Sequence, residues 1–141
     1  MAAWVLPASG SSIVDKHDWS GRNTPKGYVL RYGNGRPSFT FGSRGWNGVG
    51  TKSRVPANTW SHLVACYDGK ELRLFCNGEI SAKRPMTRPL RPSARPLRIG
   101  HGTFDKAPKR RYYGLVDEVM IWSRPLSNAK VNQLYRLQGG K

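Results

Sequence analysis

Residues 60–79, which read WSHLVACYDGKELRLFCNGE, decide the fold. Two runs rich in apolar residues, 60–67 and 71–76, are separated by Asp68-Gly69, and Asn77-Gly78 follows the second run. Asp-Gly and Asn-Gly pairs adopt the positive φ angles that tight hairpin turns require. The stretch therefore predicts two consecutive antiparallel strands and the start of a third strand.

Further short strands are predicted on both sides of this hairpin. Gly33-Asn34-Gly35-Arg36 is a strong turn signal, and alternating apolar residues after Tyr112 indicate another long strand. The predicted strands are residues 12–15, 27–32, 37–41, 60–67, 71–76, 79–81, 97–100 and 112–122. Residues 17–26 are expected to form a polar loop and residues 42–50 a glycine-rich loop. Many short strands with frequent turns predict an all-β sandwich.

Only the C-terminal end is predicted to be helical. Ser127 can cap a helix over residues 128–137, in which Val131, Leu134 and Tyr135 form an i, i+3, i+4 apolar stripe. The chain has 141 residues and a mass of 15.8 kDa, which fits a single domain over residues 1–141. No apolar run approaches the roughly 20 residues needed to cross a bilayer, so membrane insertion is not expected.

The charge balance restricts the class of partner. The sequence has 24 Lys and Arg residues against 8 Asp and Glu residues, a net charge of +16. Such a basic protein attracts polyanions, although the same charge can also serve solubility alone. Residues 83–111 hold ten of these cations and one acid, Asp105. Because Pro recurs every three or four residues in the first half of this segment, we expect an extended connection there.

The two cysteines are predicted to remain thiols. With the turn at Asp68-Gly69, Cys66 should lie opposite a residue near Arg73, which leaves Cys76 about three positions out of register. That offset exceeds the reach of a disulfide bond.

Several motifs, in this order, resemble those of the LamG-like (laminin G / concanavalin A-like) jelly-roll domains. Residues 60–69 and 72–79 resemble the family's W-x-H-L-A-x-Y-D-G and L-x-L-Y-x-N-G-E segments. Residues 97–100 resemble its P-L-x-I-G strand, and residues 114–127, GLVDEVMIWSRPLS, resemble G-x-I-D-E-V-x-I-Y-x-R-x-L-S. The start of the chain, from Trp4 onward, resembles the family's W-V-K-P and I-V-x-K segments. The resemblance implies a concanavalin A-like jelly roll and an extracellular or cell-surface location.

The resemblance also implies a difference from the family. Family members usually carry strands before the segment that begins here at Trp4. If the first strand or two are absent, a sheet edge is exposed, and we expect homo-oligomerisation or completion of the sheet by a new pairing.

The acidic residues argue against an enzyme. Glycoside hydrolysis requires two carboxylates about 5 to 10 Å apart across a cleft. Asp117 and Glu118 are adjacent on a predicted strand, so their side chains should point to opposite faces. Asp117 is expected to bond backbone or Arg groups inside the sandwich. A lyase-like set of Tyr112, His101 and Arg111 is conceivable, but these residues serve an ordinary loop equally well. We therefore predict a non-catalytic protein.

No metal cofactor is expected. The three His and two Cys residues lack the close spacing of a zinc site. The family resemblance implies calcium near a loop rim, and Asp15, Asp18 and Asn23 could supply hard oxygen ligands. The net charge of +16 opposes cation capture, so we expect no tight calcium ion.

Aromatic residues beside cations in the predicted loops are the candidate ligand contacts. Flat aromatic faces suit the apolar side of a sugar ring, and guanidinium groups suit carboxylate and sulfate. The candidate residues are Trp19, Arg22, Asn23, Arg44, Trp46, Asn47, Arg110, Arg111 and Tyr112. Packing of Trp19 and Trp46 onto the end of the sandwich is an equally good interpretation. Trp4, Trp60 and Trp122 lie in predicted strands and are expected in the core.

Two functions from different classes remain. The first is a non-catalytic carbohydrate-binding or adhesion module that favours acidic or sulfated glycans. The second is a structural or assembly module whose basic surface binds acidic partners, or which self-associates through an exposed strand edge. Basic patches with aromatic residues also suit single-stranded nucleic acid, but no nucleic-acid-binding motif is present, so this partner is disfavoured.

Overall fold

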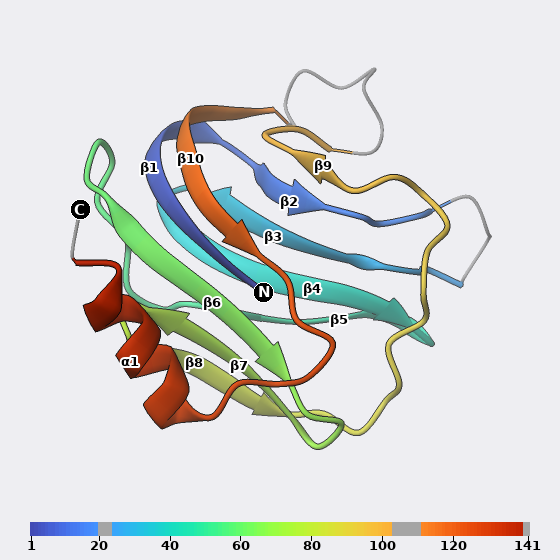
Figure 1. Ribbon diagram of the computed structural model, residues 1–141. Helices are drawn as coiled ribbons and strands as arrows, with labels where there is room; N and C mark the ends of the chain where they lie inside the picture. The colour runs from blue at the N-terminus through green and yellow to red at the C-terminus, as the bar shows by residue number, and fades with distance from the viewer. Residues whose placement is uncertain (20–23, 103–110, 140–141) are drawn as a thin grey trace.

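The computed structural model describes residues 1–19, 24–102 and 111–139, and it is a β-sandwich with one short helix in those ranges (Figure 1). Its elements are β1 (Ala2–Gly10), β2 (Ser12–Asp15), β3 (Tyr28–Gly33), β4 (Arg36–Ser43), β5 (Gly45–Gly50), β6 (Ser61–Tyr67), β7 (Glu71–Cys76), β8 (Glu79–Pro85), β9 (Arg98–Ile99), β10 (Tyr112–Met120) and α1 (Asn128–Leu137). One antiparallel sheet has the order β10-β1-β6-β7-β8, and the other has the order β5-β4-β3-β2-β9. The predicted all-β sandwich is confirmed.

The hairpin that decides the fold forms as predicted. β6 and β7 pair with Cys66 opposite Arg73 and Leu63 opposite Cys76, which confirms the predicted register. Asn77 and Gly78, with φ angles of 51° and 84°, form the next turn and lead into β8. Both cysteines are free.

The expectation of a loop over residues 42–50 is wrong. β4 continues to Ser43, and β5 begins at Gly45, so a two-strand ribbon replaces the loop. Val49 pairs with Phe39, whose side chain lies in the core, and Trp46 pairs with Gly42. The alternation of Asn47 and Val49 on one face is a strand signal, which the high glycine content obscured.

The core lies between the two sheets and follows the two-residue period of the strands. Its fully buried side chains include Phe41, Leu30, Leu63 and Leu74. Trp4 is buried as predicted, at 1% exposure, but on the outer face of its sheet. The expectation that Trp60 also lies in the core is wrong, because it is only partly buried and belongs to neither apolar cluster. Trp122 is partly buried and packs against the apolar cluster on the outer face of the β6–β7 sheet.

Helix α1 covers the outer face of the β6–β7 region (Figure 1). The Ser127 hydroxyl accepts a hydrogen bond from the Lys130 backbone N–H at 3.2 Å, which confirms the predicted cap. Val131 packs with Val64 and Phe75 in a second apolar cluster beneath the helix. Within the described residues, no helix is long and apolar enough to cross a membrane.

Strands β10 and β9 form neighbouring edges of the two sheets (Figure 1). β10 pairs with β1 on one side, and Leu115 on this strand is 59% exposed. Asp117 is also exposed, and its carboxylate accepts a hydrogen bond from the Glu118 N–H at 2.8 Å. The expectation that Asp117 lies inside the sandwich is therefore wrong. A bulge at Glu118, with φ of 52°, turns both acids toward solvent.

Candidate functional site

One end of the sandwich is crossed by an extended segment rich in arginine and proline. We call residues 84–98 the Arg-Pro strap, because Arg is followed directly by Pro at 84–85, 88–89, 91–92 and 95–96. The strap leads from the end of β8 to β9 along the right side of Figure 1. The Arg91 N–H donates to the Gly42 carbonyl at 2.9 Å, and the Gly27 N–H donates to the Arg91 carbonyl at 2.7 Å. These hydrogen bonds fix the strap against the ends of β3 and β4.

Gly42 allows the loop that follows β2 to approach this end of the sheet. A Cβ atom on Gly42 would lie 2.3 Å from the Pro25 carbonyl carbon, so no larger residue fits without displacing the backbone. Asp18 and Lys26 form an isolated antiparallel bridge, which closes the base of the loop. The loop is thereby held beside the β4–β5 ribbon, and Trp19 is held with it.

Trp19 and Trp46 form a stacked pair at this end. Their ring centroids are 5.4 Å apart, and their planes differ by 8°. Trp46 pairs with Gly42, which follows the inward-facing Phe41, so the indole lies on the outer face of the sheet. Trp19 covers it and remains 57% exposed. The pair therefore presents an aromatic surface to solvent.

A buried histidine supports the stacked pair from below. The ring of His17 is 5.6 Å from that of Trp46 at 72°, an edge-to-face contact, and His17 is 1% exposed. Its backbone N–H donates to Asp15 Oδ1 at 2.9 Å, and Nδ1 lies 2.5 Å from the same oxygen. Because the carboxylate holds both the backbone and the ring, the position of Trp46 is fixed by buried neighbours.

Three arginines of the strap contact residues that lie close to Trp19 or Trp46 in the sequence. Arg88 Nη1 donates to the carbonyl oxygen of Arg44 at 2.9 Å, and Arg84 Nη1 donates to the carbonyl oxygen of Gly48 at 3.3 Å. Arg95 Nε lies 3.4 Å from the carboxylate of Asp18, the residue before Trp19. None of the three was predicted as a site residue, although the repeated Arg-Pro pairs were a readable signal.

The structure separates the predicted site residues into groups. Trp19 and Trp46 come together, and the exposed Arg44 lies at the β4–β5 turn beside them. Asn47 is only 6% exposed, and its amide donates to the Gly45 carbonyl at 3.0 Å, so it supports the turn. The predictions for Arg22, Asn23 and Arg110 lie outside the described residues.

Arg111 and Tyr112 lie at the opposite end of β2. The Ser11 N–H donates to the Arg111 carbonyl at 3.0 Å. Trp19, in contrast, follows the other end of β2, so Arg111 and Tyr112 lie apart from the stacked pair.

Tyr112 and His101 line a hollow of about 420 Å³ together with Arg111, so the set considered for lyase chemistry is brought together. Tyr112 is 8% exposed, and its hydroxyl donates to the Leu115 carbonyl at 3.4 Å. Burial raises the pKa of this phenol well above its usual range. A phenolate base is therefore disfavoured at neutral pH.

The loop acids do not form a cation site in the part of the chain that the structure describes. Asp15 holds His17, and Asp18 is paired with Arg95. No group of three or more His, Cys, Asp or Glu side chains that could hold a metal ion occurs among the described residues.

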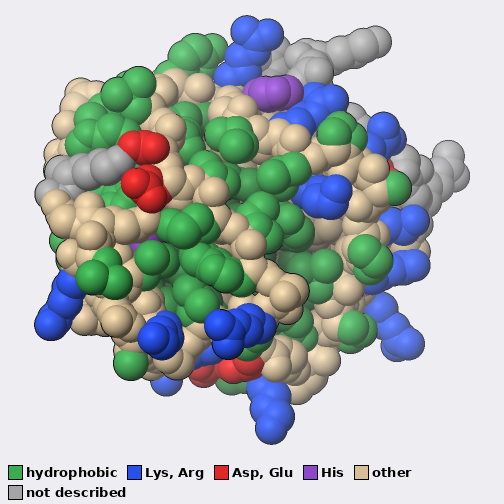
Figure 2. Space-filling view, viewed as in Figure 1, with side chains coloured by type: hydrophobic (Ala, Val, Ile, Leu, Met, Phe, Trp, Pro, Cys, Tyr) green, Lys and Arg blue, Asp and Glu red, His purple; other side chains and the backbone are tan. Residues whose placement is uncertain are grey.

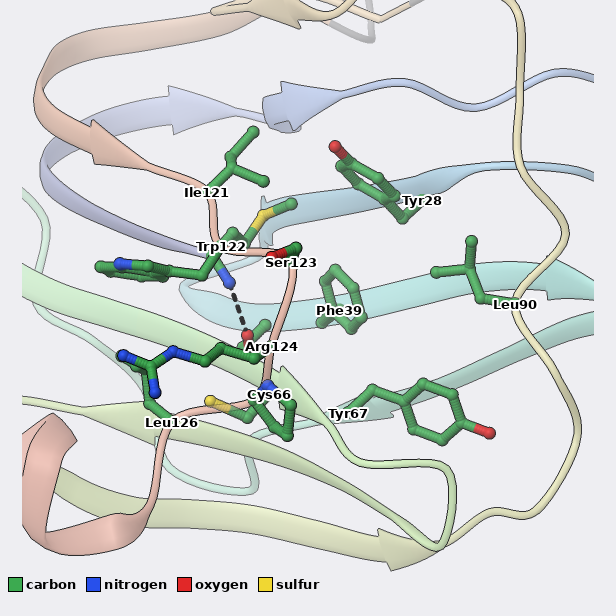
Figure 3. Close-up of a pocket in the computed structure, with 13 residues that line it drawn as sticks. Tyr28, Phe39, Cys66, Tyr67, Leu90, Ile121, Trp122, Ser123, Arg124 and Leu126 are labelled. Atoms are coloured by element: carbon green, nitrogen blue, oxygen red, sulfur yellow. Dashed lines mark hydrogen bonds between the residues drawn. The ribbon is translucent and has the colours of Figure 1, made fainter.

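A small apolar cavity of about 160 Å³ lies between the ends of the two sheets (Figure 3). Tyr28 and Phe39 line it from one sheet, Tyr67 from the other, and Leu90 from the strap. The α-ammonium group of Met1 donates a hydrogen bond to the Ala65 carbonyl at 2.8 Å, and burial lowers the pKa of this ammonium group. The described lining includes no Asp or Glu, so the cavity has no pair of carboxylates for acid and base catalysis.

Comparison with known proteins gives the family. The sequence matches the Concanavalin A-like lectin/glucanases superfamily over residues 1–132. A search of curated proteins gave no match. One similar solved structure is domain 4 of AbnA, a GH43 extracellular arabinanase from Geobacillus stearothermophilus, in complex with arabinotriose. The TM-score is 0.70 at 19% identity, over 95% of this chain and 64% of that one.

Two further similar structures have low sequence identity. The CBM40 of a Ruminococcus gnavus IT-sialidase gives a TM-score of 0.71 at 13% identity, over 99% of this chain and 81% of that one. A SAP-like pentraxin from Limulus polyphemus gives 0.69 at 11% identity, over 95% of this chain and 67% of that one. These likenesses show the shared fold. Because the family match covers nearly the whole sequence, this chain belongs to the concanavalin A-like lectin/glucanase superfamily.

Proposed function

We propose that the protein is a non-catalytic carbohydrate-binding module whose binding platform is the stacked pair Trp19 and Trp46. The observation that carries the proposal is a largely exposed indole, 57% accessible, held parallel to a second indole at 5.4 Å. A solvent-exposed aromatic surface is a feature of ligand-binding sites, and sugar rings bind to aromatic faces through their apolar C–H side.

The platform is preorganised. Trp46 rests on the buried His17, and Trp19 rests on Trp46, so ligand binding need not order either indole. Preorganisation reduces the entropy lost on binding. The predicted alternative, in which both indoles only pack onto the end of the sandwich, accounts for Trp46 but leaves the outer face of Trp19 without a role.

Similar structures support a glycan as the ligand. The AbnA domain was solved with arabinotriose, and the Ruminococcus gnavus domain is named as a carbohydrate-binding module. A further similar structure is described as a putative carbohydrate-binding protein from Bacteroides ovatus, although this chain covers only 39% of its length. AbnA is an extracellular enzyme, which supports an extracellular location for this chain as part of the proposal.

The finer part of the proposal is a preference for acidic or sulfated glycans. The net charge is +16, and Arg88 and Arg84 bind the backbone carbonyls of Arg44 and Gly48, which precede and follow Trp46. Guanidinium groups bind carboxylate and sulfate through two parallel hydrogen bonds. The carboxylates nearest the platform, Asp15 and Asp18, are engaged by His17 and Arg95, which supports binding without catalysis.

The test is titration calorimetry with a neutral arabino-oligosaccharide and a hyaluronan octasaccharide, which carries one carboxylate on every second sugar. Trp46→Ala should weaken binding of both ligands at least tenfold, about 1.4 kcal/mol or more. Tyr113→Ala is the matched control, because Tyr113 is also an exposed aromatic residue (52%) but lies on β10. The proposal fails if Trp46→Ala binds both ligands as well as Tyr113→Ala does.

The exposed edge of β10 favours assembly as a second candidate function. Leu115 on β10 and Ile99 on β9 are 59% and 49% exposed on neighbouring strand edges. Unpaired edges with apolar side chains invite pairing with another strand. Sedimentation at several protein concentrations tests this candidate: a concentration-dependent dimer that Leu115→Lys abolishes supports it, and a monomer at all concentrations refutes it.

A further inference from the structure

We propose that the Arg-Pro strap is a docking track for an acidic polysaccharide that carries one anionic group on every second sugar. This inference rests on the proposed glycan-binding function and deepens it, because it proposes that Arg84, Arg88 and Arg95 bind the anionic groups of the glycan. In Figure 2, Lys and Arg side chains are spaced along the side of the molecule on which the strap runs in Figure 1.

The prolines stiffen the strap, because a residue before proline is restricted to extended backbone. The segment has no regular secondary structure between β8 and β9, and it bends at Arg88 and Arg95. The strap is also tied to the sandwich, because the Tyr67 hydroxyl donates to the Arg88 carbonyl at 2.6 Å and Lys16 Nζ donates to the Arg95 carbonyl at 2.6 Å.

Two of the guanidinium groups are fixed by backbone carbonyls. Arg88 is anchored on the carbonyl of Arg44, and Arg84 is anchored on the carbonyl of Gly48. Arg44 lies at the β4–β5 turn and Gly48 lies in β5, so the extended stretch between these carbonyls is residues 45–48, which span about 10 Å. Trp46 lies midway between the two carbonyls in the sequence. The two cations are therefore bonded to the backbone on either side of Trp46, and the separation of their anchors is closer to the length of two sugar rings than to that of one.

The anchors leave the two cations available to a ligand. A guanidinium has five N–H donors, and a neutral carbonyl takes up one of them without cancelling the charge. Arg95 extends the track beyond Trp19, where Asp18 holds it at 3.4 Å while 45% of its side chain remains exposed. A rigid row of separated cations suits a stiff chain whose charges are also separated.

The observations favour a polysaccharide over a nucleic acid. Single-stranded nucleic acids bind by stacking successive bases on several aromatic residues along a groove. Here the aromatic residues form one stacked pair, and the anchors of the cations on either side of Trp46 lie about 10 Å apart along β5. Phosphates in a nucleic acid follow each other much more closely than these cations do.

The experiment compares two charge-matched triple variants. The strap variant carries Arg84→Gln, Arg88→Gln and Arg95→Gln. The control variant removes three exposed cations elsewhere, with Arg54→Gln, Lys130→Gln and Arg136→Gln. Affinity for the hyaluronan octasaccharide is measured from 50 to 300 mM NaCl, and circular dichroism checks that each variant is folded.

The strap variant should lose at least tenfold in affinity, and the slope of log K against log salt should fall by about two to three. The control variant should lose less than threefold. The single variants Arg84→Gln and Arg95→Gln, each expected to lose about threefold, keep the test valid if the triple variant is unfolded.

Equal losses in both triple variants would overturn the inference and leave only nonspecific charge. Binding of oligo(dT) of matched length as tight as that of hyaluronan would overturn the choice of occupant. The two proposals fail separately. If Trp46→Ala leaves binding intact, the indole platform is refuted, whereas equal losses in the strap and control variants refute only the track.

Discussion

Acidification should destabilise the protein through His62, a residue buried beneath helix α1. Its side chain is fully buried, and neither ring nitrogen has a hydrogen-bond partner among the described residues. The ring lies 5.1 Å from that of Trp4 and 6.0 Å from that of Tyr135. Burial lowers the pKa of His62 from 6.5 to about 4, because a charged imidazolium cannot be solvated there.

The direction of the effect follows from proton binding. Below pH 6.5 the unfolded chain takes up a proton at His62 that the folded protein rejects until the pH approaches 4, so stability falls as the pH falls through this window. Between pH 7 and pH 4.5 the loss from this one group is roughly 2–3 kcal/mol. No carboxylate among the described contacts of His62 would stabilise its protonated form. Glu118 bonds to Gln138, which in turn bonds to Trp4, the ring beside His62.

The assay is urea unfolding of the natural protein and of His62→Phe at pH 7 and pH 4.5. Phe keeps the aromatic packing and cannot be protonated, so the variant should lose roughly 2–3 kcal/mol less stability over this pH range than the natural protein. Subtracting the two curves removes the contribution of carboxylates, which titrate in both proteins. Parallel losses in the two proteins would refute the assignment of the effect to His62.

Three further variants test the packing that positions the site. Gly42→Ala should destabilise the fold by about 1–3 kcal/mol and weaken glycan binding, because the new methyl group meets the Pro25 backbone; unchanged urea and binding curves would contradict this. Phe75→Ala should cost about 3–5 kcal/mol in urea unfolding, since the side chain is fully buried under α1; a loss below 1 kcal/mol would show that the helix does not dock there. Ser127→Ala should cost about 1 kcal/mol through the lost helix cap, whereas Ser127→Asp should retain most of the stability; equal stability of the Ala variant and the natural protein would contradict the cap.

The fold could be predicted because its signals are local. Asp68-Gly69 and Asn77-Gly78 define two turns in a short distance, and the apolar alternation between them fixes the register of β6 and β7. The helix was equally readable from Ser127 and its apolar stripe. Residues 42–50 were misread, because glycine normally marks a loop, and only the pairing of β4 with β5 shows that Gly42 and Gly48 are strand residues.

The site was only partly predictable because it is assembled from distant segments. Trp19 and Trp46 were chosen separately, yet nothing in the sequence shows that they stack. The strap arginines were read as part of a charged connection, because their anchors on Arg44 and Gly48 lie about 40 residues away in the sequence. Tyr112 was predicted as a site residue together with Trp19 and Trp46 because it also lies beside arginines in the sequence, although it lies at the other end of β2 from the stacked pair.

The most direct test of the indole platform is a two-dimensional NMR titration that follows the tryptophan indole N–H signals. The hyaluronan octasaccharide should shift the signals of Trp19 and Trp46 together, with one dissociation constant. The signal of Trp4, whose indole N–H donates to Gln138 at 2.9 Å under the helix, should stay in place as an internal reference. If the sugar binds and the Trp19 and Trp46 signals do not move, the sugar-binding site lies elsewhere on the protein and the proposed role of the stacked pair is wrong.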